Sequence, residues 1–173
     1  MKNKNIYIEK GFTLVEVLIA IAIMSLLVLS VASMVVAMSV QEKRTRAITE
    51  VDSGASSIMD DISQSLRNAS SITTPIASTT STSTMTLGMS LIPTENPTLY
   101  SFATSTIQVT KGASTPYRMT NKNVIVDSIS FQNLSATSTN GTIRVTLKVS
   151  YNNTANDAKL NYSTILITTV SLR

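Results

Sequence analysis

The chain has 173 residues, with 14 basic and 10 acidic side chains, a formal net charge of +4, and neither cysteine nor histidine. The two missing residue types exclude disulfides, Cys–His and Ser–His nucleophilic chemistry, and the usual zinc ligands. The small net charge argues against nucleic acid as a partner bound by bulk electrostatics, and the length leaves room for one small domain beyond any membrane segment.

The chain opens with a short, polar and basic segment, residues 1–11, which contains Lys2, Lys4 and Lys10. An apolar run follows from Val17 to Val40, 24 residues without a charge, a proline or a glycine. As a helix this run measures roughly 36 Å, against about 30 Å of bilayer hydrocarbon, and it is longer than the apolar core of a secretory signal. The sequence therefore predicts a membrane-spanning helix over residues 12–40.

Charge alone does not orient this helix. The three leader lysines favour a cytoplasmic N-terminus, but Lys43, Arg44 and Arg46 follow the apolar run, partly offset by Glu42. The positive charges on the two sides of the apolar run are nearly equal, so the positive-inside rule does not predict which end of the helix is cytoplasmic.

A single acid, Glu16, stands at the entrance of the apolar run. A carboxylate at the centre of a bilayer costs on the order of 2.5–3.5 kcal/mol, and less near a helix end. A carboxylate would only hinder the insertion of an isolated anchor, so we expect a cation from a partner to neutralise Glu16. The positive end of the helix dipole also stabilises a negative charge at this position.

The stretch Lys10-Gly11-Phe12-Thr13-Leu14-Val15-Glu16, with its long apolar helix, resembles the N-terminus of type IV pilins and the pseudopilins of type II secretion. The resemblance implies that prepilin peptidase cuts after Gly11 on the cytoplasmic face and that the new N-terminal residue, Phe12, is N-methylated. It also implies that Glu16 pairs with the N-terminal amine of a neighbouring subunit during assembly. No catalytic residue, metal ligand or cofactor is implied.

The same resemblance implies the topology and the partners. The leader lies in the cytoplasm, the chain from Val40 onward lies outside the cytoplasmic membrane, and the protein later moves to a periplasmic or cell-surface filament. Its partners are other pilin or pseudopilin subunits, the prepilin peptidase/methyltransferase, membrane lipid and an inner-membrane assembly platform. Pilus, secretion and competence systems share this N-terminus, so the system stays open, as does the choice between a major and a minor subunit.

The helix is predicted to continue over residues 41–68 as an amphipathic segment. Its apolar positions recur at spacings of three and four, a pattern typical of a helix with one buried face. They are Ile48, Val51, Ala55, Ile58, Met59, Ile62 and Leu66. Charged residues occupy the remaining faces, and Gly54 is not expected to end the helix.

Residues 69–84 are rich in serine and threonine and include Pro75, a composition that predicts a loop or linker. O-linked sugar on this segment stays an open alternative.

Residues 85–173 show short alternating segments separated by turn signals, and predict an antiparallel β-sheet domain. Expected strands cover 85–92, 99–103, 106–110, 117–120, 124–134, 142–151 and 160–172, with tight turns at Lys111-Gly112 and Asn140-Gly141. The predicted fold class is α+β, pilin-like, with a long N-terminal helix packed under this sheet.

Two further surface groups are weighed. The segment from Asn152 to Asp157 is rich in oxygen atoms but has one carboxylate, so a turn is favoured over a calcium site. Lys111, Arg118 and Lys122 lack interleaved aromatics, so solvated surface is favoured over a nucleic-acid site.

The resemblance implies that the protein is a structural subunit, a minor pilin or pseudopilin, of a type IV pilus-like filament, assembled through its N-terminal helix, and not an enzyme. The alternative is a single-pass, membrane-anchored extracytoplasmic binding module that never polymerises.

Overall fold

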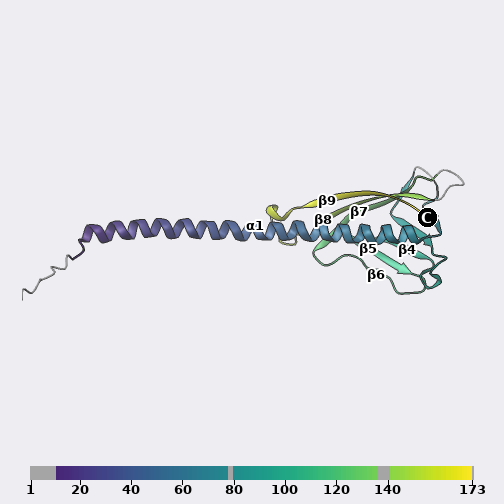
Figure 1. The fold of residues 1–173 in the computed structure, drawn as a ribbon, viewed down its shortest axis with the longest axis horizontal. Coiled ribbons are helices and arrows are strands. Elements are labelled where there is room, and N and C mark those ends of the chain that lie inside the picture. The colour runs from purple at the N-terminus through teal and green to yellow at the C-terminus, as the bar shows by residue number, and fades with distance from the viewer. Residues whose placement is uncertain (1–10, 78–79, 136–140, 173) are drawn as a thin grey trace, which may run out of the picture. The chain divides into compact units, whose positions relative to one another are not determined.

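The structure is a computed structural model that describes residues 11–77, 80–135 and 141–172 (Figure 1). It begins with one α-helix, α1 (Leu14–Asn68), of 55 residues. The strands that follow are β1 (Ser71–Thr74), β2 (Ser81–Thr82), β3 (Thr84–Gly88), β4 (Thr98–Ala103), β5 (Thr106–Lys111), β6 (Tyr117–Arg118), β7 (Val124–Asn133), β8 (Thr142–Tyr151) and β9 (Ser163–Ser171). Two 3-10 turns, η1 (Pro93–Glu95) and η2 (Ala158–Leu160), lie among them.

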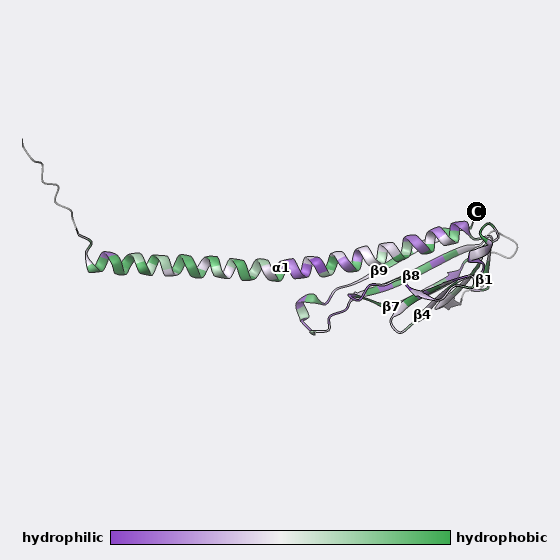
Figure 2. Ribbon diagram, turned by 90° about the horizontal axis from the view of Figure 1, so that it is seen from below, coloured by the Kyte–Doolittle hydropathy of each residue, from purple (hydrophilic) through white to green (hydrophobic). Residues whose placement is uncertain are grey.

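The chain divides into two compact units, residues 1–42 and residues 43–173. In the first unit, the described residues from Gly11 to Ser39 are all exposed. Figure 2 shows that most of this part of α1 is hydrophobic. Within the described part of the chain, none of these side chains is buried.

In the second unit, one face of α1 is buried and the predicted spacing is confirmed. The buried apolar residues of this helix face are Ala47, Val51, Ala55, Ile58, Met59, Ile62 and Leu66. Ile48, which was predicted to be part of this face, is only half-buried. Its neighbour Ala47 is buried instead and is the first residue of the buried face. Gly54 stays within the helix and lies against β7, where an added Cβ would be 3.4 Å from Val124.

The strands form two antiparallel sheets, so the predicted α+β class is confirmed and the strands are divided more finely than expected. The five-stranded sheet has the order β1-β3-β4-β5-β6, and the four-stranded sheet has the order β2-β7-β8-β9. Both sheets and the buried face of α1 contribute to one hydrophobic core. Its largest fully buried side chains include Tyr100 from β4 and Phe131 from β7.

The alternation predicted for residues 142–151 matches β8. Ile143, Val145, Leu147 and Val149 are fully buried, whereas Arg144 and Lys148 on the other face are exposed. Because side chains alternate across a strand, this pattern places every second residue in the core.

The loop prediction for residues 69–84 is wrong in part. β1 pairs with β3, and β2 pairs with β7, although both strands are short and rich in serine and threonine. The serine- and threonine-rich composition predicted a loop, but these strands require only backbone pairing at a sheet edge. In β1 one apolar side chain, Ile72, also contacts the core.

Two turn predictions have different outcomes. Lys111-Gly112 is confirmed as a turn, and Gly112 has φ +56° with a Cβ position that the Thr94 carbonyl oxygen would block, so glycine is required there. Asn140, the first residue of the other predicted turn, lies outside the described residues. The last strand begins at Ser163 instead of Leu160, because Asp157 caps the η2 turn before it.

Candidate assembly site at the start of the helix

The candidate site begins with Gly11 and Phe12, which precede the helix. Both residues are exposed, and the Phe12 side chain keeps 81% of its accessible surface. A Cβ added at Gly11 would meet nothing within 4 Å. Packing among the described residues therefore does not require glycine at this position, and the peptide bond that follows it lies in exposed, non-helical backbone.

Thr13 begins the helix, a role that the sequence analysis missed. The Glu16 backbone N–H donates to the Thr13 hydroxyl at 3.3 Å and to the Thr13 carbonyl oxygen at 3.1 Å. This is one half of a capping box, for which Thr-x-x-Glu is the sequence signal. The cap sets the first helical residue at Leu14 and places Glu16 in the first turn, where the helix dipole favours a negative charge.

Phe12 and Glu16 lie on the same side of the helix start. They line one open surface together with Ala20, Met24 and Val28, which recur every four residues along the helix. The Glu16 carboxylate thus lies at one end of an apolar stripe, one turn from Phe12.

The helix is long and apolar enough to cross a membrane. None of its most apolar stretch is buried among the described residues. Three serine hydroxyls donate to carbonyl oxygens of their own helix: Ser25 to Ala22 at 2.8 Å, Ser33 to Ser30 at 2.8 Å, and Ser39 to Val35 at 3.0 Å. These serines therefore need no partner in lipid, whereas a carboxylate does.

Three acids on the second half of α1, which the periodicity places outside the apolar face, make hydrogen bonds to residues in or next to the strands. The Tyr100 hydroxyl donates to Asp61 Oδ2 at 2.9 Å and lies 2.7 Å from Ser65 Oγ, and burial raises the pKa of Tyr100. Tyr162 donates to Asp52 Oδ1 at 3.0 Å, a hydrogen bond that raises the pKa of Tyr162. The third acid, Glu50, accepts from Asn123 Nδ2 at 3.2 Å. These acids hold the sheets to the helix by hydrogen bonds.

The oxygen-rich segment after β8 uses its polar groups in its own turn. Asn153 Nδ2 donates to the Asp157 carbonyl oxygen and to Asn161 Oδ1, both at 2.7 Å. The Asp157 and Lys159 backbone N–H groups donate to Asn153 Oδ1 and Asp157 Oδ1. This network is the Asx-type turn that the sequence analysis favoured.

The basic residues weighed as a surface group do not act together. Lys111 Nζ lies 3.2 Å from Glu95 Oε2 across the turn, while Arg118 Nε donates to Thr106 Oγ1 at 3.5 Å. Burial by itself lowers the pKa of Lys111, but the hydrogen bond with Glu95 raises it, and the net change is upward.

Comparison with known families gives one match, the prokaryotic N-terminal methylation motif, over residues 8–32. The matched range contains Gly11, Phe12, Thr13 and Glu16 and extends into the apolar part of α1 as far as residue 32. Comparison with curated proteins and with solved structures gives no match.

Proposed function

We propose that this member of the type IV pilin and pseudopilin family is a minor structural subunit of a type IV pilus-like filament. The observation that carries the proposal is the methylation motif over a helix that is apolar on all sides and exposed from Gly11 to Ser39, with one acid at its start. Such a helix needs lipid before assembly and other helices afterwards.

Processing is assigned to the junction between Gly11 and Phe12. Prepilin peptidase removes residues 1–11 on the cytoplasmic side, and the new amine of Phe12 is N-methylated. The exposed, non-helical junction supports this step, since a peptidase binds its substrate in an extended form. We assign the requirement for Gly11 to the enzyme, since among the described residues no atom beyond its chain neighbours lies within 4 Å of a Cβ added there.

Assembly is assigned to Glu16. In the bilayer the carboxylate is costly, and in the filament the Phe12 amine of a neighbouring subunit supplies the opposite charge. The cleaved leader faces the cytoplasm, residues 43–173 lie outside, and an inner-membrane platform transfers the helix from lipid into the filament. The apolar helix surface stays covered throughout.

The first experiment is the intact mass of the chain extracted from membranes. The expected mass corresponds to a chain that begins at N-methylated Phe12. A chain that retains Met1 would instead support a membrane-anchored binding module that never polymerises.

The second experiment separates insertion from assembly. We expect Glu16→Leu to insert into the membrane and to be absent from sheared filaments, because the carboxylate is needed only between subunits. Glu42→Gln, a change to an acid beyond the apolar run, is the matched control and should be incorporated normally. Normal incorporation of the Glu16→Leu chain would contradict the assembly role.

A further inference from the structure

Two basic residues just after the apolar run have no role in the proposed processing or assembly. Lys43 and Arg44 follow the run on the side opposite to the leader lysines, and the family match ends before them, at residue 32. Both side chains are exposed, and neither has a hydrogen bond or an ion pair among the described residues. On the proposed topology they lie outside the cytoplasm, where the positive-inside rule does not account for them.

Lys43 and Arg44 extend the side of α1 that the sheets cover. They lie one helical turn before Ala47, which is buried, and Ile48, which is half-buried. Residues four apart lie on the same face of a helix, and every Cα–Cβ bond tilts toward the helix N-terminus. The two basic side chains are therefore on the same side of the helix as the domain and lean toward the apolar run.

Two loops of the domain are attached to the helix close to this point. Asn123 Nδ2, in the loop before β7, donates to Glu50 Oε1 at 3.2 Å, and Tyr162, in the connection from β8 to β9, donates to Asp52 Oδ1 at 3.0 Å. Figure 1 shows this connection alongside α1, at the end of β8 and β9 that lies toward the N-terminal part of the helix. At 1.5 Å per residue, the two attachment points are about 10–14 Å from Lys43 along the helix axis.

Each of these loops carries an exposed lysine. They are Lys122, next to Asn123, and Lys159, in the η2 turn of the β8–β9 connection. The loops are also joined to each other, because Asn152 Nδ2 donates to the Lys122 carbonyl oxygen at 2.8 Å. In the part of the chain that the structure describes, neither lysine ammonium group has a hydrogen bond or an ion pair.

The acids at this end of the domain are engaged within the chain. Glu50 and Asp52 are half-buried and accept the hydrogen bonds from the two loops. Asp157 Oδ1 accepts from the Lys159 backbone N–H at 3.0 Å and caps the η2 turn, and Glu42 also has an interaction within the chain. We call the four basic residues without a side-chain partner among the described residues the basic end of the domain: Lys43, Arg44, Lys122 and Lys159.

From these observations we propose that the basic end binds anionic phospholipid headgroups and holds the domain against the surface of the bilayer that anchors α1. The apolar run ends at Val40, so a bilayer that contains the run places its headgroups beside Lys43 and Arg44. Each basic side chain near an anionic membrane surface strengthens binding by about fivefold. The inference needs only the membrane helix, so it goes beyond the filament function and does not depend on it.

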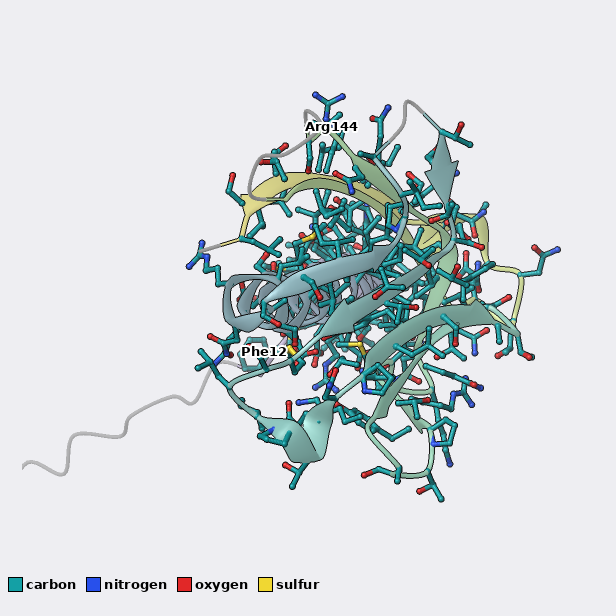
Figure 3. All side chains as sticks on the ribbon, turned by 90° about the vertical axis from the view of Figure 1, so that its right-hand side faces the viewer. Phe12 and Arg144 are labelled. Carbon is teal, nitrogen blue, oxygen red and sulfur yellow. The ribbon has the colours of Figure 1, made fainter. Side chains whose placement is uncertain are left out.

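Basic residues at the other end of the domain supply a matched control. Arg67 is in the last turn of α1, and Arg144, near the start of β8, projects outward from the domain (Figure 3). Both are exposed, as Lys122 and Lys159 are. Replacing either pair by glutamine therefore removes the same amount of charge from the surface, at opposite ends of the domain.

The test uses the full chain in lipid nanodiscs, with Ala155→Cys in the β8–β9 connection as the attachment point for a fluorophore. The chain has no cysteine of its own, and Ala155 is exposed, so the label is unique and accessible. The discs contain phosphatidylcholine alone or an equal mixture with phosphatidylglycerol, each with the same amount of a lipid that carries a quencher on its headgroup. Quenching reports that the domain lies against the bilayer.

We expect strong quenching in the anionic discs and weak quenching in the neutral discs. Salt at about 1 M, where the Debye length is about 3 Å, should abolish the difference. Equal quenching in the two lipids, or a difference that salt does not change, would overturn the proposal.

The two glutamine pairs test whether the basic end itself is responsible. Lys122→Gln with Lys159→Gln should shift the docking equilibrium in anionic discs toward the undocked state by about fivefold for each lysine removed. Arg67→Gln with Arg144→Gln should leave it unchanged. Equal loss with both pairs, or no loss with the lysine pair, would contradict the lipid site. Circular dichroism checks that both pairs keep the fold, which is expected because the four side chains are exposed.

Discussion

The two halves of α1 are built from the same element and differ in what covers them. From Leu14 to Ser39 the helix has apolar residues on every side and all of them are exposed. From Ala47 to Leu66 apolar residues occupy one face, which the two sheets cover. An apolar stripe is sufficient for a helix that packs on its own domain, whereas a helix that is apolar all around needs lipid or neighbouring helices.

Polar groups follow the same division. In the first half, serine hydroxyls donate to their own helix, and Glu16 is the acid that the proposed assembly contact would satisfy. In the second half, Asp52 accepts from Tyr162, which precedes β9, and Asp61 accepts from Tyr100 of β4, whose hydroxyl also contacts Ser65. The proposed partner of Glu16 in the first half thus belongs to another molecule. In the second half, Asp52, Asp61 and Ser65 are hydrogen-bonded within the chain, whereas the buried Glu50 Oε2 has no hydrogen-bond partner among the described residues.

The largest expected effect comes from the same substitution made in each half. Leu66→Ala, at a fully buried residue, should lower the free energy of unfolding of the domain by about 2–5 kcal/mol. Leu27→Ala, at an exposed residue of the first half, should change it by less than about 0.5 kcal/mol. Denaturant unfolding in detergent, followed by circular dichroism, measures both. Equal effects would show that the two halves are not independent.

Tyr100→Phe should lower the stability of the domain by about 1–3 kcal/mol, because it removes the hydroxyl that donates to Asp61 and contacts Ser65. Tyr117→Phe is the matched control, since Tyr117 is exposed and should give a change near zero. A neutral Tyr100→Phe result would mean that solvent or a rearranged side chain replaces these bonds.

Alkaline pH should weaken the second half selectively. Burial raises the pKa of Tyr100 above the value of about 10 for an unfolded tyrosine, so the folded state holds the phenolic proton more tightly. The resulting stability is fully present below pH about 10 and is lost as the pH rises above it. Unfolding measured from pH 7 to pH 12 should show this decline, and Tyr100→Phe should reduce it. The same slope in both proteins would contradict the assignment.

A pair of serines gives the smallest expected effect. Ser65→Ala removes a buried hydrogen-bond partner of the Tyr100 hydroxyl and should cost about 1 kcal/mol. Ser33→Ala removes a hydroxyl that bonds only to its own helix and should be close to neutral. Thermal unfolding of the two variants side by side makes this comparison, and a larger effect at Ser33 than at Ser65 would reverse it.

Several features of the site were accessible from the sequence because they depend on local order. Gly11, Phe12 and Glu16 are adjacent in the chain, so their spacing alone predicts a site, and the family match covers the same stretch. Thr13 was also accessible, through the Thr-x-x-Glu signal, but was missed. The roles of Gly11, Phe12 and Glu16 stay predictions until the mass and incorporation experiments are done.

The contacts of Asp52 and Asp61 were not accessible in this way. Their partners, Tyr162 and Tyr100, are 110 and 39 residues away along the chain, and periodicity assigns an acid to a face without naming what covers that face. The strands β1 and β2 were missed for a similar reason, since their pairing depends on β3 and β7 and not on their own side chains.

By itself, the sequence determined the long helix, its apolar half, the acid at its start and the alternation of β8, because each follows from residue spacing within one element. The division of the strands into two sheets, the tyrosine contacts with the helix and the position of Lys122 and Lys159 at the basic end of the domain were decided by the tertiary structure. These features arise from pairing between segments that are distant in the chain, where backbone hydrogen bonds are the same for every residue type and carry little sequence information.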